Sequence, residues 1–165
     1  MADYVALLAS MDVVFVQPAL VEDKLTAAPK KARKLHFTDP FIHHAVTSWL
    51  RPVRDPFTEQ VRPLLDDADR CSRLVESCAV THVRREYPTF YIKAKGEVDI
   101  AYVKGGKFWP VEVKWSKQVR PSDIKQIIKY DNGRIWDRSR SLRSVLGVPV
   151  EPLPVALLRL GMETK

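Results

Sequence analysis

The chain has 165 residues, of which 45% are hydrophobic and 28% are charged, a length that suits one compact domain. This composition excludes a disordered tail, and no apolar run approaches the ~18 residues of a membrane-spanning helix. The first cation is Lys24, so the cationic start of a signal peptide is missing. We therefore expect a cytoplasmic protein without a membrane partner.

The N-terminal 67 residues predict helices and a pair of strands. The segment 3–11 is apolar and helix-prone, and 13–16 is β-branched and aromatic, which is typical of a strand. The polar stretch 22–34 predicts an exposed loop before a second strand at 35–37. Asp39 is placed to cap a helix that begins at Pro40 and ends near Pro52.

The remaining residues, 68–165, predict a helix, three strands, a helix and a strand, which is an α/β plan. Apolar residues recur every three or four positions from Asp69, which indicates a helix, and Glu76 lies at the border of that stripe. The segments that follow are strands at 89–94, 97–103 and 107–115, a helix at 121–130, a basic stretch at 134–143 that is helical in part, and a buried strand at 154–160.

The net charge is +7, and its placement is informative. Residues 104–143 contain eleven cations and four acids, which accounts for the whole excess. A positive field gathered in one segment favours a phosphate-backbone partner, because each neutralised phosphate releases counterions. A solvated basic surface without a ligand is the alternative.

A Gly-Gly pair at 105–106 predicts a two-residue hairpin turn between two of the strands. That register places Asp99 directly opposite Glu112, with Lys114 on the same face. Like charges in opposed positions destabilise a sheet, so a divalent cation or a shared proton should offset the repulsion. The competing interpretation is a surface salt bridge between Glu112 and Lys114, with Asp99 solvated.

Two groups of short blocks carry a resemblance to known families. The pattern Glu97-Val98-Asp99, followed by PVEVK at 110–114 and preceded by a helix that carries Glu76, resembles the PD-(D/E)XK nuclease superfamily. The blocks LHFTDP at 35–40 and RLVE at 73–76 look like the C-terminal nuclease-like domain of archaeal-type AAA+ ATPases.

The resemblance implies a restriction-endonuclease-like core at 68–165 and a metal-dependent nuclease that hydrolyses DNA. Asp99, Glu112 and the backbone carbonyl of Val113 would ligate Mg²⁺, or Mn²⁺ in its place. Lys114 would orient the attacking water or stabilise developing phosphate charge. Glu76 matches the helix glutamate that joins the site in some members, although a solvated glutamate is the alternative. Glu97 would face Lys114 across the hairpin.

The chain also departs from the ATPase pattern, because it has no glycine-rich phosphate cradle and is not expected to hydrolyse ATP. Residues 3–16 resemble the end of a winged-helix region, which implies a fused or associated AAA+ ATPase as partner. Four cations beyond the candidate site would place a DNA backbone across it: Lys117, Arg120, Lys125 and Lys129. Interleaved tryptophans pack in the core or stack on bases.

Two alternatives to a nuclease remain open at this level. The first is a non-catalytic DNA-binding or regulatory module that retains the nuclease fold, and the second is a domain that docks a separate ATPase. The sequence also leaves a homo-oligomer open.

Overall fold

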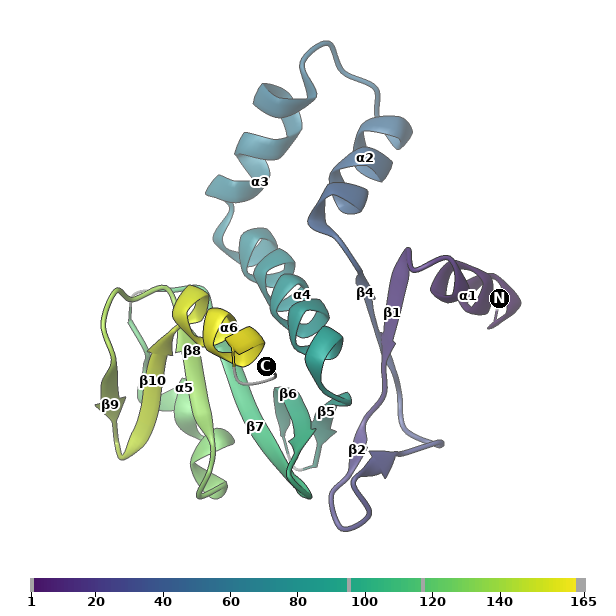
Figure 1. Ribbon diagram of the computed structural model, residues 1–165. Helices are drawn as coiled ribbons and strands as arrows, with labels where there is room; N and C mark the ends of the chain where they lie inside the picture. Colours follow the sequence, from purple (N-terminus) through teal and green to yellow (C-terminus); the bar gives the residue numbers. More distant parts are fainter. Residues whose placement is uncertain (1, 95, 117, 163–165) are drawn as a thin grey trace.

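A six-stranded mixed sheet forms the centre of the computed structural model, which describes residues 2–94, 96–116 and 118–162 (Figure 1). Its strands, in spatial order, are β5 (Thr89–Lys93), β6 (Glu97–Lys104), β7 (Lys107–Lys114), β8 (Arg134–Asp137), β10 (Val148–Pro152) and β9 (Arg143–Val145). β5, β6 and β7 pair antiparallel, β8 runs parallel to both β7 and β10, and β9 returns antiparallel to β10.

Two helices cover one face of this sheet (Figure 1). The helix α4 (Ala68–Glu86) begins where the Asp67 carboxylate accepts hydrogen bonds from two backbone N–H groups of its first turn, and its apolar stripe packs on the sheet with α6 (Leu153–Met162). The opposite face is covered by the short helices α5 (Pro121–Ile124) and η2 (Ile127–Lys129), whose buried isoleucines contact β8 and β10.

The N-terminal part forms smaller elements beside β5. The helix α1 (Ala2–Ser10) leads into β1 (Val14–Gln17), which pairs antiparallel with β4 (Lys34–Phe37), while β2 (Leu20–Val21) pairs with β3 (Thr26–Ala27). Three further helices, α2 (Pro40–Leu50), η1 (Phe57–Val61) and α3 (Arg62–Asp66), connect β4 to α4. The Asp39 carboxylate accepts a hydrogen bond from Phe41 N, 2.7 Å away, which confirms the predicted cap.

The mixed sheet with flanking helices confirms the predicted α/β class, but three predicted elements are wrong. The segment 154–160 is part of the helix α6, because its buried residues Leu153, Ala156 and Leu160 recur at helical spacing while its neighbours are exposed. A short apolar run does not distinguish a buried strand from a helix. The basic stretch at 134–143 begins with the strand β8, whose Ile135 and Trp136 are buried on opposite faces of the sheet, and it ends at Arg143, the first residue of β9. The helix predicted at 121–130 is broken into α5 and η2.

The predicted boundary at residues 67 and 68 coincides with the N-cap of α4. Both sides of this boundary supply residues to the candidate site described below. None of the described helices is both long enough and apolar enough to cross a lipid bilayer.

Candidate active site

The turn between β6 and β7 determines which residues of the two strands meet. Gly105 and Gly106 both have positive φ, +60° and +70°, the conformation that a two-residue hairpin turn requires. The pairing runs from Lys104 opposite Lys107 to Ile100 opposite Val111, so the predicted register is confirmed. Asp99 and Glu112 lie one step beyond the last of these pairs.

Asp99 is largely withdrawn from water, with its side chain 15% exposed. Its Oδ2 atom accepts a hydrogen bond from Val113 N at 2.9 Å, which fixes the carboxylate at the end of β7. Burial, and then the negative charges of Glu112 and Glu76, raise the pKa of Asp99 to about 8. The alternative in which Asp99 is solvated is therefore wrong, and the positive charge near the carboxylate is too weak to offset its burial.

Glu112 is 8% exposed, and its two oxygen atoms have different surroundings. The Oε1 atom lies 2.8 Å from Lys114 Nζ, so the ion pair of the competing interpretation exists, although Glu112 is buried rather than on the surface. The Oε2 atom is buried and has no hydrogen-bond partner among the described residues. Burial raises the pKa of Glu112 against the opposing effect of Lys114.

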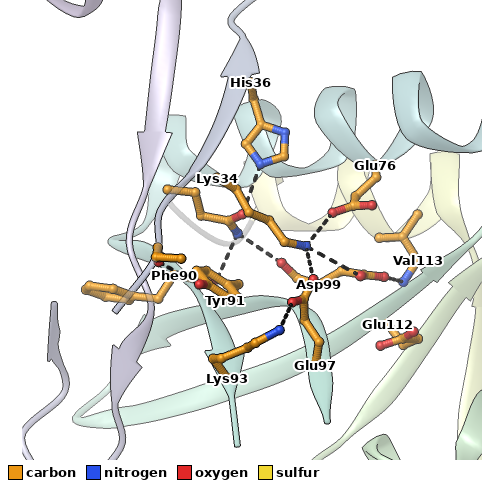
Figure 2. Close-up of polar contacts among 12 residues, drawn as sticks. Lys34, His36, Glu76, Phe90, Tyr91, Lys93, Glu97, Asp99, Glu112 and Val113 are labelled. Atoms are coloured by element: carbon orange, nitrogen blue, oxygen red, sulfur yellow. Dashed lines mark hydrogen bonds and ion pairs between the residues drawn. The ribbon is translucent and has the colours of Figure 1, made fainter. Parts of the chain in front are cut away.

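Lys34 is the site residue that the sequence interpretation missed, because it falls in a stretch predicted to be an exposed loop. It is the first residue of β4, and its ammonium lies 2.9 Å from Glu76 Oε1, 2.7 Å from Glu97 Oε1 and 3.9 Å from Asp99 Oδ1 (Figure 2). Burial opposes the charged form, but the surrounding carboxylates outweigh it and raise the pKa of Lys34. The sequence held one signal for this position. Lys34 lies two residues before His36, and residues i and i+2 of a strand share a face, so the two side chains point the same way. In the structure His36 is buried.

Glu76, Glu97, Asp99 and Glu112 form what we call the carboxylate cluster. Glu76 reaches it from α4 and is bound to Lys34 (Figure 2), so its predicted place near the site is confirmed and the solvated alternative is wrong. Glu97 forms ion pairs with Lys34 and with Lys93, at 2.7 and 3.0 Å, in place of the predicted position facing Lys114. Its partner is Lys34 because β4 approaches the start of β6.

A buried glutamine joins the N-terminal strands to the sheet beside this cluster. The Gln17 side-chain amide donates to the backbone oxygen atoms of Phe90 and Asp99, both at 2.9 Å. Its Oε1 atom lies 3.0 Å from His36 Nε2. Burial lowers the pKa of His36 to about 4, so the neutral ring donates to Gln17. This network holds β1 and β4 against β5 and β6.

Three lysines, Lys34, Lys93 and Lys114, form ion pairs with the four carboxyl groups of the cluster. No group of three or more His, Cys, Asp or Glu side chains in the described part of the chain is arranged to hold a metal ion. Asp99 and Glu112 remain the pair that fits a cation. The raised pKa of Asp99 and the unpartnered Glu112 Oε2 atom are what a hard cation with oxygen ligands would relieve.

The structure describes three of the four cations that were predicted to contact nucleic acid. Lys117 lies outside the described residues, whereas Arg120, Lys125 and Lys129 are exposed. Arg120 lines a cavity of about 470 Å³ with Lys114, Trp115 and Asp123, so it lies close to the candidate site. The three tryptophans of the basic segment pack in or against the core: Trp136 is fully buried, and Trp109 and Trp115 pack against the core cluster.

Comparison with known families gives one match. A family model described as "Domain of unknown function (DUF4143)" matches residues 71–142, less than half of the chain. These residues run from α4 to just before β9 and include Glu76, Asp99, Glu112 and Lys114. Comparison with curated proteins and with solved structures finds no significant match.

Proposed function

We propose that the chain is a metal-dependent nuclease that hydrolyses phosphodiester bonds of DNA, built on a restriction-endonuclease-like core. The order of elements supports the fold part of the proposal. The helix α4 precedes three antiparallel strands, and α5 then leads to β8, which is parallel to β7. This is the helix, three strands, helix, strand order that the resemblance to the PD-(D/E)XK superfamily implies, with β8 as its last strand.

The observation that carries the proposal is the proximity of Asp99 to Glu112 beyond the last pair of β6 and β7, where the Asp99 carboxylate accepts a hydrogen bond from Val113 N, next to Glu112. Both carboxylates are mostly buried, the Glu112 Oε2 atom has no partner among the described residues, and Lys114 adjoins them. Two buried acids close together lower the stability of the fold. A bound divalent cation would offset this cost and would explain why both acids are present.

Asp99, Glu112 and the carbonyl of Val113 would hold Mg²⁺ or Mn²⁺, and the bound ion would supply activation of a water molecule and neutralisation of phosphate charge. The hydrogen bond from Val113 N orients the Asp99 carboxylate before any ligand arrives. Burial opposes the charge of Lys114, but its acidic neighbours outweigh it, and its pKa is raised. Lys114 is therefore protonated at neutral pH and serves to orient water or to stabilise the phosphate, not to accept a proton.

A specific observation favours a second candidate function, a non-catalytic DNA-binding or regulatory module. Lys34 and Lys114 already form close ion pairs with Glu76, Glu97 and Glu112, so lysines supply part of the positive charge that a metal would bring. In either case the exposed Arg120, Lys125 and Lys129 provide a basic surface for a phosphate backbone. The resemblance also supports an AAA+ ATPase as fused or associated partner.

Incubation with nicked, branched and single-stranded DNA tests catalysis, with Mg²⁺, Mn²⁺ or EDTA present. We expect cleavage that requires the metal and is lost in Glu112→Gln and Lys114→Met. Glu86→Gln and Lys107→Met are matched controls, because these exposed residues remove the same charges away from the site. Metal-independent binding with no cleavage of any substrate would overturn the nuclease and leave the binding module.

A further inference from the structure

A cavity of about 570 Å³ adjoins the carboxylate cluster and has no role in the proposed hydrolysis. It is lined by residues of β4, α2, α3 and α4, and two of them, Lys34 and Glu76, also belong to the site. Figure 1 shows α2 and α3 standing beyond the end of α4, away from the six-stranded sheet. The cavity therefore lies where these helices meet α4, directly beside the site.

The lining combines cationic and apolar side chains. Arg70, Arg73 and Glu76 follow one another at three-residue steps along α4, which places them along one side of the helix. With Lys34 they give three cations against one acid. Four of the other seven lining residues are apolar, Leu35, Phe37, Leu64 and Leu74, and the remaining three are His36, His43 and Ser77. Such a cavity suits a ligand that has both a flat apolar part and an anionic part.

We infer that this cavity holds one unpaired nucleotide of the nucleic-acid substrate, with its phosphate on Arg70 and Arg73 and its base against Phe37 and Leu74. The inference rests on the proposed nucleic-acid partner. The volume lies in the range of small-ligand sites, and arginine is suited to phosphate because its planar fork donates two hydrogen bonds. Paired and stacked bases of a duplex cannot enter such a cavity, so the cavity selects unpaired nucleotides.

The second cavity, which Lys114 and Arg120 line, indicates the path of the nucleic-acid strand toward the first cavity. It contains Ser72 of α4, so both cavities border the same helix, and each shares a lysine with the ion pairs of the cluster. A strand whose backbone lies along Arg120 and Lys114 would pass the paired acids and reach the first cavity. The expected substrate is a junction between duplex and single strand.

Binding in EDTA tests this without any need for cleavage. The probes are a blunt duplex and the same duplex with a short single-stranded flap that carries the fluorescent base 2-aminopurine. We expect the wild type to bind the flapped duplex at least about tenfold more tightly and to change the 2-aminopurine signal. In Arg70→Gln/Arg73→Gln this preference should disappear, and the salt slope of flap binding should fall by about 0.7, the value for one neutralised single-strand phosphate.

Two further variants separate the cavity from general electrostatics. Leu74→Trp fills the cavity without changing charge, and it should abolish the 2-aminopurine change while duplex binding persists. Arg85→Gln/Lys107→Gln removes two exposed cations elsewhere and should keep the flap preference. Equal binding of both probes by the wild type, or a flap preference that survives Leu74→Trp and the double arginine change, would overturn the inference. Flap-selective binding without cleavage in Mg²⁺ would reject the nuclease but keep the cavity, whereas cleavage without flap preference would do the reverse.

Discussion

The Lys34 Nζ atom lies 2.9 Å from Glu76 Oε1, although the two residues are 42 positions apart in the chain. Lys34 comes from the N-terminal strand pair and Glu76 from the helix that crosses the central sheet. The N-terminal strands therefore supply the cation that holds three acids of the carboxylate cluster together.

Lys34→Met should destabilise the fold, because it leaves Glu76, Glu97 and Asp99 without their shared cation. We expect the free energy of unfolding to fall by about 1–3 kcal/mol, the cost of removing one partner from a partly buried ion-pair group. Urea unfolding in EDTA measures this, and Lys30→Met, an exposed lysine on the same segment, is the control. Excess Mg²⁺ should recover part of the loss. Equal midpoints for the two variants would contradict the role of Lys34.

The stability of the metal-free protein should depend on pH through Asp99. Its pKa of about 8 in the folded state lies above the ordinary 3.8, so the folded state keeps a proton that the unfolded chain has lost between these values. The free energy of unfolding therefore decreases as pH rises from about 4 to about 8. Asp99→Asn should make this decrease smaller, and the part that remains comes from Glu112, whose pKa burial also raises.

Urea unfolding at pH 5 to 9 in EDTA tests this, with the difference between wild type and Asp99→Asn as the readout. The difference isolates Asp99, because His36 titrates in both proteins. The lowered pKa of His36, about 4 against an ordinary 6.5, acts in the opposite direction and costs stability as pH falls through that interval. Parallel curves for the two proteins would mean that Asp99 is ionised throughout.

Local sequence patterns were enough to predict the hairpin and the residues that it brings together. Two glycines set the turn, the turn set the register, and the register placed Asp99 near Glu112. Lys34 could not be predicted in the same way, because its contacts are tertiary and its neighbours Lys30, Lys31 and Arg33 are exposed. The segment 154–160 was assigned to the wrong class since its apolar run suits a strand as well as a helix.

Gln17→Leu should be among the most destabilising single changes in the protein. The side chain is fully buried, and its loss removes the hydrogen bonds to the carbonyls of Phe90 and Asp99 and to the ring of His36. We expect a loss of about 3–5 kcal/mol, from the sum of these lost hydrogen bonds. Gln60→Leu is the control, because Gln60 also makes two hydrogen bonds but lies in a more exposed place. Urea unfolding that ranked the two variants equally would rule out this anchoring role.

The basic surface should govern the salt dependence of DNA binding. Changing Arg120, Lys125 and Lys129 together to Gln should weaken duplex binding and lower the slope of log K against log salt by about 0.9 for each phosphate that the protein no longer neutralises. Fluorescence anisotropy in EDTA at several salt concentrations measures the slope. Glu112→Gln, measured in parallel, should not lower the slope. An unchanged slope in the triple variant would place the DNA path elsewhere.

The Gly105-Gly106 turn gives the protein an unusual vulnerability. Strand side chains alternate between faces, so one extra residue in this loop could slide β6 along β7 by a single step and send Asp99 and Glu112 to opposite sides of the sheet. Such an insertion lies several residues from either acid, yet it would separate the two carboxylates that the proposed site requires. The length of the loop at a remote bend is thus as important for the proposed activity as the identity of the acids themselves.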